Sequence, residues 1–322
     1  MEILVVKLGA LGDVINTLPL VILLKKHLKA EIHWIVAPLS YPIVSGHPSV
    51  DRTILFEKSS WRSSIVEVTK AIRSHPFDLV LDLQRILKSS TLCMLAKGKR
   101  RIGFDRKRCK EMTWLFPFER IPASDPSSHM LLQYLEFADY LGIKESGITW
   151  ELTASPTRPD ALPDPYIVLN IGATKPANKW TVQGFASLTN DIARQFGISC
   201  VITGGREDME MAKQIETISS EKPVNLAGRT TMDDLKDILQ HARAVVTCDT
   251  GPMHLAVALG KEVVALFGPS DPRRTGPFKG HVIQKTVPCS PCSRKTCENP
   301  ICMSEITPED VMKKLNAILD RP

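Results

Sequence analysis

The chain has 322 residues, of which 43% are apolar and 24% are charged. This length allows two domains of ordinary size, and the composition excludes a globally disordered chain. The formal net charge of +6 is concentrated, because Lys and Arg outnumber Asp and Glu two to one between residues 51 and 120. Such a basic belt predicts an acidic partner, either a phosphorylated or carboxylated ligand, a membrane surface or a nucleic acid, unless it is only solvated surface.

No targeting or membrane-spanning segment is expected. The apolar run Ile3–Val6 is far shorter than the core of a signal peptide, and no stretch approaches the roughly 20 apolar residues of a membrane helix. We therefore expect a cytoplasmic protein, in which Cys93, Cys109, Cys200 and Cys248 are free thiols.

The first half of the chain has the rhythm of alternating strands and helices. A short strand is predicted at Glu2–Lys7, a tight loop at Gly9–Asp13, and a helix at Val14–Leu28 that contains an anomalous proline, Pro19. Further strands are predicted at Ile32–Val36 and Leu79–Leu83, the latter after a helical pattern. This order predicts a parallel sheet that is covered by helices on both faces.

Residues 153–165 are rich in proline and poor in apolar side chains, which is typical of a linker. We therefore predict an N-terminal domain at 1–155 and a C-terminal domain at 156–322, each an α/β, Rossmann-like, doubly wound sheet. The second domain is predicted to contain strands at Tyr166–Asn170, Ile198–Thr203, Ala244–Thr247 and Val263–Phe267, and a helix from the N-cap Thr181 to Phe196. Ligands bind outside the carboxyl ends of such strands, so these loops should face a cleft between the domains.

The loop from Gly9 to Asp13 is neither a dinucleotide fingerprint nor a Walker loop, because it lacks G-x-G-x-x-G and a following Gly-Lys-Ser/Thr. Asp13 lies where a strand gives way to a helix. It can simply complement the helix dipole there, or it can act in chemistry.

Three loops of the second half carry residues that are suited to a phosphorylated ligand. Asp249–His254 follows a strand and opens a helix, whose N–H groups suit a diphosphate, although Asp249 or Thr250 can equally be a simple cap. Lys179 ends another loop and can reach a leaving diphosphate, if it is not a solvated surface lysine. Glu207 or Asp208 can accept hydrogen bonds from ribose hydroxyls.

Four further cysteines lie close together near the C-terminus. Their spacing is C-x2-C-x4-C-x4-C, which can hold a zinc ion or an iron–sulfur cluster. The interpretation that we adopt is a loop of free or oxidisable thiols, with the metal site as the alternative. The residues are Cys289, Cys292, Cys297 and Cys302. Residues 307–319 are predicted to form a closing helix with Thr307 as its cap.

Taken together, these segments resemble the ADP-heptose:lipopolysaccharide heptosyltransferases, glycosyltransferase family nine. The matching segments are VKLGALGDVINTLP (6–19), FDLVLDLQRILKSS (77–90), KRRIGFD (99–105), NIGATKPANKW (170–180), TGGRED (203–208) and VVTCDTGPMHLAVALGKEVVALFGPSDP (245–272). The resemblance implies a GT-B fold, an N-terminal acceptor domain and a C-terminal donor domain. It also implies transfer with inversion at the anomeric carbon, without a metal, and a last helix that packs back onto the N-terminal domain.

The resemblance also assigns roles to single residues. Asp13 matches the general base, and Lys88 matches a basic position near the acceptor, where Arg62 and Arg106 are further candidates. Arg85 stands where many family members have glycine. The donor residues that it implies are Lys179, Asp208, Asp249, Thr250, Gly251 and His254.

The function that these features imply is transfer of a heptose from ADP-heptose to the Kdo/heptose inner core of lipopolysaccharide. No cofactor is expected besides this donor substrate, and the enzyme is expected to sit peripherally on the inner face of the cytoplasmic membrane. A nucleotide-sugar epimerase of similar fold, or a family member that uses a different sugar, is the alternative. A nucleic-acid-binding protein is disfavoured, because aromatic residues are only 6% of the chain and do not alternate with basic ones.

Overall fold

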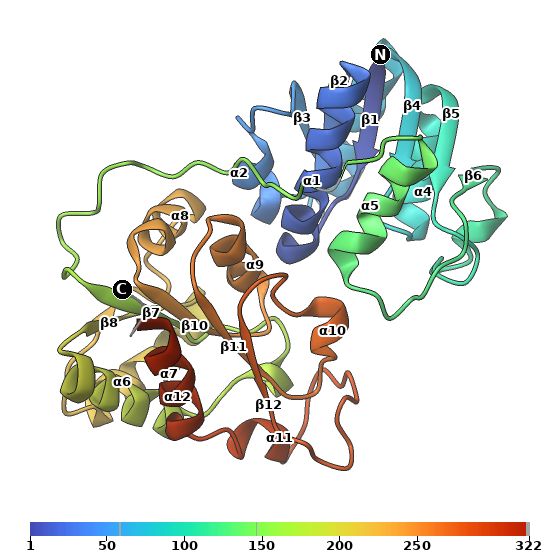
Figure 1. Cartoon of the computed structure of the whole chain (residues 1–322). Helices are drawn as coiled ribbons and strands as arrows, with labels where there is room; N and C mark the ends of the chain where they lie inside the picture. The colour runs from blue at the N-terminus through green and yellow to red at the C-terminus, as the bar shows by residue number, and fades with distance from the viewer. Residues whose placement is uncertain (58, 146, 320–322) are drawn as a thin grey trace. The chain divides into compact units, whose positions relative to one another are not determined.

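The computed structural model describes residues 1–57, 59–145 and 147–319. The chain divides into two compact units, Met1–Leu152 and Thr153–Pro322. The division lies close to the predicted boundary after residue 155, and residues 153–165 form neither helix nor strand. Each unit is built around its own parallel six-stranded sheet (Figure 1).

The sheet of the first unit has the strand order β3-β2-β1-β4-β5-β6. All of its neighbouring strands run parallel. The strands are β1 (Glu2–Val6), β2 (Glu31–Val36), β3 (Arg52–Leu55), β4 (Pro76–Asp82), β5 (Lys97–Gly103) and β6 (Glu119–Arg120). The helices are α1 (Leu11–Leu28), α2 (Tyr41–Val44), α3 (Trp61–Ser74), α4 (Leu87–Leu95) and α5 (Met130–Tyr140), with 3-10 turns at Pro38–Ser40 and Thr113–Leu115.

Alternation along the strands separates the two faces of this sheet. Leu4 and Val6 belong to a buried cluster with Val68 of α3 and Leu92 of α4. α1 packs against α5, and most of α1 is buried, including Pro19. Helices therefore cover both faces, as the alternation of strands and helices predicted.

The first helix begins earlier than predicted. It starts at Leu11 rather than Val14, because the amide of Val14 already bonds the carbonyl oxygen of Ala10 at 3.0 Å. Asp13 therefore lies in the first turn of α1 and not in the loop before it.

The second unit repeats the same architecture with the strand order β12-β11-β10-β7-β8-β9. Its strands are β7 (Tyr166–Asn170), β8 (Ser199–Thr203), β9 (Val224–Asn225), β10 (Ala244–Cys248), β11 (Val263–Phe267) and β12 (His281–Gln284). Its helices are α6 (Val182–Phe196), α7 (Met209–Ile218), α8 (Met232–His241), α9 (Gly251–Ala258), α10 (Pro272–Thr275), α11 (Ile301–Ser304) and α12 (Pro308–Leu319), with 3-10 turns at Pro176–Asn178 and Arg206–Asp208.

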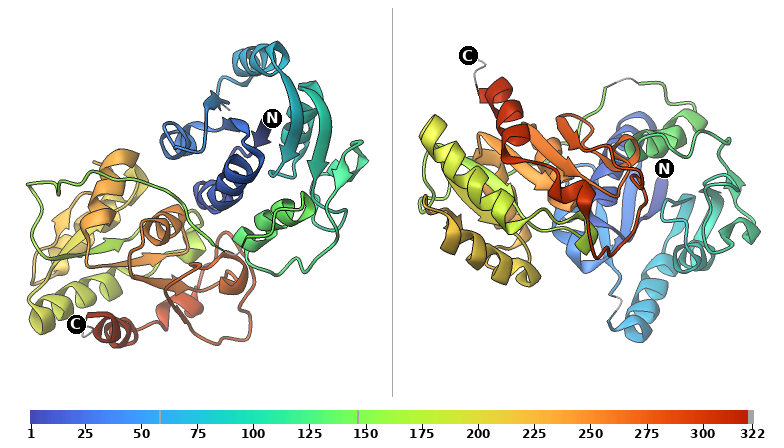
Figure 2. Two further views of the ribbon diagram at one scale, coloured as in Figure 1. Left: turned by 45° about the horizontal axis from the view of Figure 1, so that its top comes forward. Right: turned by 90° about the horizontal axis from the view of Figure 1, so that it is seen from below.

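Local signals account for several of these boundaries. The hydroxyl of Thr181 accepts a hydrogen bond from the amide of Gly184 at 2.9 Å and so caps α6, as predicted. Thr307 likewise accepts from the amide of Asp310 at the start of α12. α12 lies beside α6 (Figures 1 and 2). Its apolar face, including Val311 and Leu315, is buried in the core of the second unit. The apolar side of the last helix therefore packs within this unit.

Within the described part of the chain, no helix is both long enough and apolar enough to cross a membrane.

Candidate active site

The strand order of each sheet defines where a ligand is expected. In the first sheet the chain winds outward in opposite directions from the neighbours β1 and β4, and in the second from β7 and β10. At such a switch point the loops after the two central strands diverge and leave room for a ligand at the carboxyl ends. Asp13 follows β1, and Asp249 follows β10.

Asp13 is held by a lysine that directly follows β1. The ammonium of Lys7 lies 3.0 Å from Oδ2 of Asp13. The lysine side chain is 1% exposed, whereas that of Asp13 is 32% exposed. Burial lowers the pKa of Lys7, and the Asp13 carboxylate opposes that shift. The lysine is therefore hidden, while the carboxylate that it positions stays accessible.

The loop before α1 is fastened to the neighbouring strand β4. Oε1 of Gln84 accepts hydrogen bonds from the amides of Leu8 at 3.0 Å and Gly9 at 3.2 Å. Asp82, at the end of β4, accepts hydrogen bonds from the backbone amides of Gln84 and Arg85 and from the Ser90 hydroxyl. Burial raises the pKa of Asp82. These hydrogen bonds connect the loop after β1 to the loop after β4 and order the latter.

The three predicted acceptor residues all follow strands of the first sheet. Arg62 lies in the first turn of α3, Lys88 in that of α4, and Arg106 in the loop after β5. All three are exposed, and the guanidinium of Arg106 lies 5.6 Å from the ring centre of Trp114. Because β3, β4 and β5 are parallel, these cations belong to the same sheet edge as Asp13.

In the second unit, Lys179 forms an ion pair with Asp208 across the ends of β7 and β8. Asp208 is almost fully buried and also accepts a hydrogen bond from the amide of Gly205 at 2.9 Å. Glu207, the alternative acid for a ribose, is exposed. Lys179 keeps about a quarter of its side chain accessible, since its exposure is 26%.

Asp249 is the centre of a second polar cluster at the carboxyl ends of the strands of the second sheet. Its Oδ2 accepts a hydrogen bond from Nδ2 of Asn178 at 3.0 Å, and its side chain also bonds Ser270. Burial raises the pKa of Asp249, and the hydrogen bond from Ser270 opposes that shift. Oδ1 of Asn178 is buried without a hydrogen-bond partner among the described residues. Such an unpaired acceptor costs about 1–3 kcal/mol unless water or a ligand satisfies it.

α9 begins next to Asp249. Thr250 is the N-cap residue, and its side chain makes no capping hydrogen bond to the described helix. Gly251 and Pro252 form the first turn, and His254 is buried on the same helix. The helix N-terminus therefore offers its positive end toward the strand edge, which suits an anion.

Two groups of side chains could hold a metal ion by their chemistry. The thiols of Cys289 and Cys297 are exposed, and that of Cys302 is buried. Burial and the neighbouring Cys289, Cys292 and Cys297 raise the pKa of Cys302. The four cysteines are thus neighbours, but no three sulfur atoms come within 4.8 Å of one another in the described structure.

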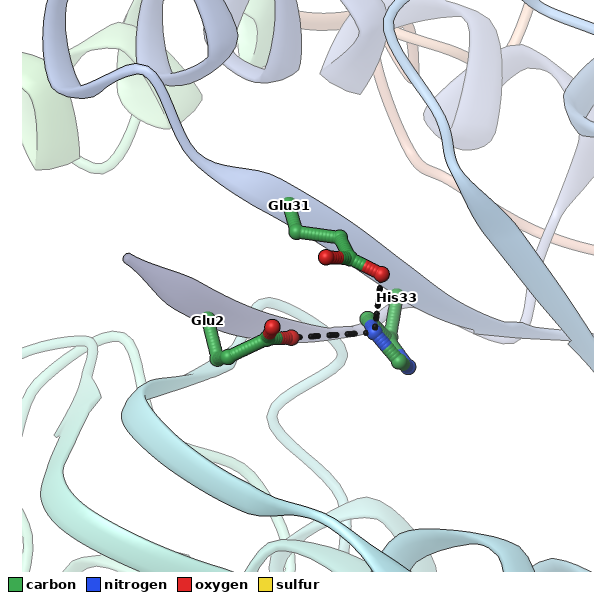
Figure 3. A group of neighbouring side chains, drawn as sticks. All are labelled: Glu2, Glu31 and His33. Carbon is green, nitrogen blue, oxygen red and sulfur yellow. Dashed lines mark ion pairs between the residues drawn. The ribbon is translucent and has the colours of Figure 1, made fainter.

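The second group is Glu2, Glu31 and His33 (Figure 3). Glu2 and Glu31 are register partners on β1 and β2, and His33 lies on the same face as Glu31, two residues further along β2. Nε2 of His33 lies 3.1 Å from Oε2 of Glu2. These residues stand at the amino ends of the strands, so they belong to the edge opposite Asp13.

Sequence reasoning missed four residues of these edges: Lys7, Gln84, Asn178 and Ser270. Lys7 carried one signal, because it ends an apolar strand run directly before a glycine loop. The other three act through side chains that meet across strands distant in sequence.

The Lys7–Asp13 pair predicts an asymmetric response to neutralisation. Asp13→Asn leaves a buried ammonium unpaired and should cost about 3 kcal/mol, whereas Lys7→Met leaves an accessible carboxylate and should cost about 1 kcal/mol. In Asp13→Asn the loss should shrink as the pH rises toward 10, because the unfolded state then binds more protons than the native state. Urea denaturation from pH 7 to 10 measures this. Equal losses for the two variants would contradict the pairing.

Comparisons with known proteins agree with this architecture. The model of glycosyltransferase family 9 (heptosyltransferase) matches residues 65–302. The lipopolysaccharide core heptosyltransferase OpsX of Haemophilus influenzae is 28% identical over 286 residues, which cover 85% of this chain and 81% of that protein.

Two solved structures share the fold. The glycosyl transferase family 9 from Veillonella parvula superposes with a TM-score of 0.83 at 23% identity, covering 100% of this chain and 97% of that one. The Escherichia coli heptosyltransferase WaaC with ADP-2-deoxy-2-fluoro heptose gives a TM-score of 0.78 at 22% identity, covering 98% and 99%. The two Rossmann-like units are thus those of a GT-B glycosyltransferase, and the family match over residues 65–302 shows that the chain belongs to glycosyltransferase family 9.

Proposed function

We propose that this chain transfers a heptose from ADP-heptose, with inversion, to the Kdo/heptose inner core of lipopolysaccharide. The observation that carries the proposal is the Lys7–Asp13 pair, which presents a positioned and accessible carboxylate at the switch point of the first unit. The related OpsX is named for transfer to the lipopolysaccharide core, and the related WaaC structure contains an ADP-heptose analogue. The first unit then binds the acceptor, and the second binds the donor.

Asp13 acts as the general base in this proposal. An acceptor hydroxyl is a poor nucleophile at neutral pH, because almost none of it is ionised. The carboxylate of Asp13 takes the hydroxyl proton while the oxygen bonds the anomeric carbon and the bond to the ADP phosphate breaks. A single displacement of this kind inverts the anomeric carbon and needs no covalent sugar–enzyme intermediate.

The second unit meets the charge that grows on the leaving diphosphate. Lys179 supplies a cation, and the first turn of α9 supplies the positive end of a helix. In this proposal Asp208 serves the ribose, Asp249 bonds sugar hydroxyls or the loop, and Thr250, Gly251 and His254 line the donor. In this proposal these groups meet the charge of the leaving diphosphate without a metal or other cofactor.

The acceptor side is proposed to be basic and to lie at a membrane. Arg62, Lys88 and Arg106 would hold acidic groups of a lipid-borne acceptor. Leu87 is 52% exposed directly before Lys88, so an apolar and a cationic side chain stand together. Such a surface suits peripheral attachment to the inner face of the cytoplasmic membrane.

Asp13→Asn should lower kcat by about 10²–10⁴-fold while leaving ADP affinity intact, because it removes the base and not the donor site. Turnover is measured by mass spectrometry of the acceptor product, and ADP binding by calorimetry. The matched control is the double variant Lys7→Met/Asp13→Asn, which contains no unpaired charge. If Asp13 only neutralises Lys7, the double variant should regain turnover, and that result would refute the base assignment.

Lys179→Met should weaken ADP binding about 10- to 100-fold, because one charge-assisted contact to phosphate is lost. Calorimetry with ADP measures it. Lys213→Met, which removes an exposed lysine from α7 of the same unit, is the control and should bind ADP like the parent. Equal affinity of both variants would remove Lys179 from the donor site.

The membrane proposal predicts co-sedimentation with vesicles that contain anionic lipid, and not with neutral vesicles. Each lysine or arginine near an anionic surface contributes about 1 kcal/mol, and salt screens it. The bound fraction should therefore fall between about 0.05 and 0.5 M salt. A protein that stays in the supernatant at low salt with anionic vesicles would contradict this attachment.

A further inference from the structure

Arg85 is held in an unusual backbone conformation at the end of β4. Its φ is +65°, in the left-handed region that favours glycine. This chain therefore places a long cationic side chain where the backbone conformation favours glycine. Residues kept in such conformations cluster at functional sites, because the surrounding structure must offset their cost.

The guanidinium of Arg85 is buried without a carboxylate. The residue is only 6% exposed, and its Nε is buried without a hydrogen-bond partner among the described residues. Nη2 reaches only the sulfur of Met130, at 3.8 Å, which is a weak acceptor. The guanidinium carbon lies 4.7 Å from the ring centre of Phe104. No acidic side chain of the described residues pairs with it.

Arg108 provides an internal comparison. It lies 4.9 Å from the centre of the same Phe104 ring and is equally buried. It nevertheless pairs with two carboxylates, those of Asp105 and Glu136. The fold therefore neutralises one of the two guanidinium groups on this ring and leaves the other without a carboxylate partner.

The nearby acids are already engaged. Asp13 pairs with Lys7, and the oxygens of Asp82 accept from Ser90 and from the backbone amides of Gln84 and Arg85. Lys7 and Arg85 are close enough for Arg85 to lower the pKa of Lys7, although burial is the main cause of that shift. Two cations thus stand at the switch point of the first unit, and only Lys7 has a carboxylate partner.

We propose that Arg85 binds an anionic group of the acceptor sugar, a carboxylate or a phosphate, beside the hydroxyl that Asp13 activates. This inference rests on the proposed function of the first unit and adds a specificity-determining residue to it. A guanidinium presents two parallel N–H donors, which match the oxygens of either anion. Acceptors that lack the group should therefore be poor substrates of this enzyme.

The test is acceptor binding and turnover with Arg85→Met, which keeps an unbranched apolar stem and removes the charge and the N–H donors. Acceptor Kd and KM should rise about 10- to 100-fold, the effect of one lost charge-assisted contact. ADP affinity should stay unchanged. The melting temperature should stay equal or rise, because a buried cation without a carboxylate partner is removed. Arg85→Lys should recover only part of the affinity, since it restores the charge without the paired donors.

Arg100→Met is the matched control. Arg100 lies on the neighbouring strand β5 and pairs with Glu119 at 2.7 Å, so its removal changes the net charge equally. It should leave acceptor affinity within about twofold of the parent, since exposed pairs contribute little. If both variants lose acceptor affinity to the same degree, the effect is one of net charge and the assignment of Arg85 is wrong.

Two modified acceptors separate the sources of the anion. One carries its sugar carboxylates as amides, and the other has its sugar phosphates removed. The parent enzyme should lose affinity for one of them, and Arg85→Met should lose nothing further for that same acceptor. A lower melting temperature with unchanged acceptor affinity would show a structural role and overturn the proposal. Acceptor binding is measured without donor. If the proposed donor sugar is wrong, turnover will therefore be absent while the acceptor-binding results still test Arg85.

Discussion

Lys7 stands at the end of β1 with its ammonium almost entirely removed from water, and this position requires a carboxylate nearby. Asp13 meets the requirement from the first turn of α1, so the strand end and the helix start are tied by one ion pair. Gln84 then holds the intervening backbone against β4. The buried Lys7 fixes the position of the carboxylate, and the accessible carboxylate of Asp13 can contact a substrate hydroxyl.

The two units have the same sheet topology, but the charged groups at the carboxyl ends of their strands differ. At the edge of the first sheet, exposed cations follow β3, β4 and β5, and Lys7 positions the accessible carboxylate of Asp13. At the edge of the second, the buried acid Asp249 accepts hydrogen bonds from Asn178 and Ser270. The carboxylate oxygens of Asp249 are therefore engaged with neighbouring loops of the second unit, beside the helix N-terminus that is suited to phosphate.

Much of the fold was predictable from the sequence, since its signals are local. The strands Tyr166–Asn170 and Val263–Phe267 are short apolar runs with turn residues on both sides, and Thr181 caps α6 as its hydroxyl and spacing predict. The start of α1 was predicted too late, because Gly12 and Asp13 resemble a loop by composition although their backbone is helical. Gly12 and Asp13 have low helix propensity, but burial of Leu11 in the core stabilises the helix at this point.

The site was predictable only where one residue carries the signal. Asp13, Lys179 and Asp249 stand in motifs, but Gln84 and Ser270 act by reaching loops that are distant in sequence. No periodicity encodes such a contact, because it depends on which strands become neighbours. The resemblance to the family supplied roles for the motif residues. The supporting hydrogen bonds became visible only in the structure.

Buried groups without hydrogen-bond partners indicate which kind of ligand each sheet edge favours. Nε of Arg85 in the first unit and Oδ1 of Asn178 in the second are buried without hydrogen-bond partners among the described residues. Each such group typically costs about 1–3 kcal/mol, which is a noticeable fraction of the stability of one domain. A fold can bear that cost when a ligand later satisfies the group, and the ligand's binding then includes the recovered hydrogen bond. A cation without a carboxylate partner in the first unit and an unpaired acceptor in the second therefore favour ligands of different chemistry: an anion at Arg85 and a hydrogen-bond donor at Asn178.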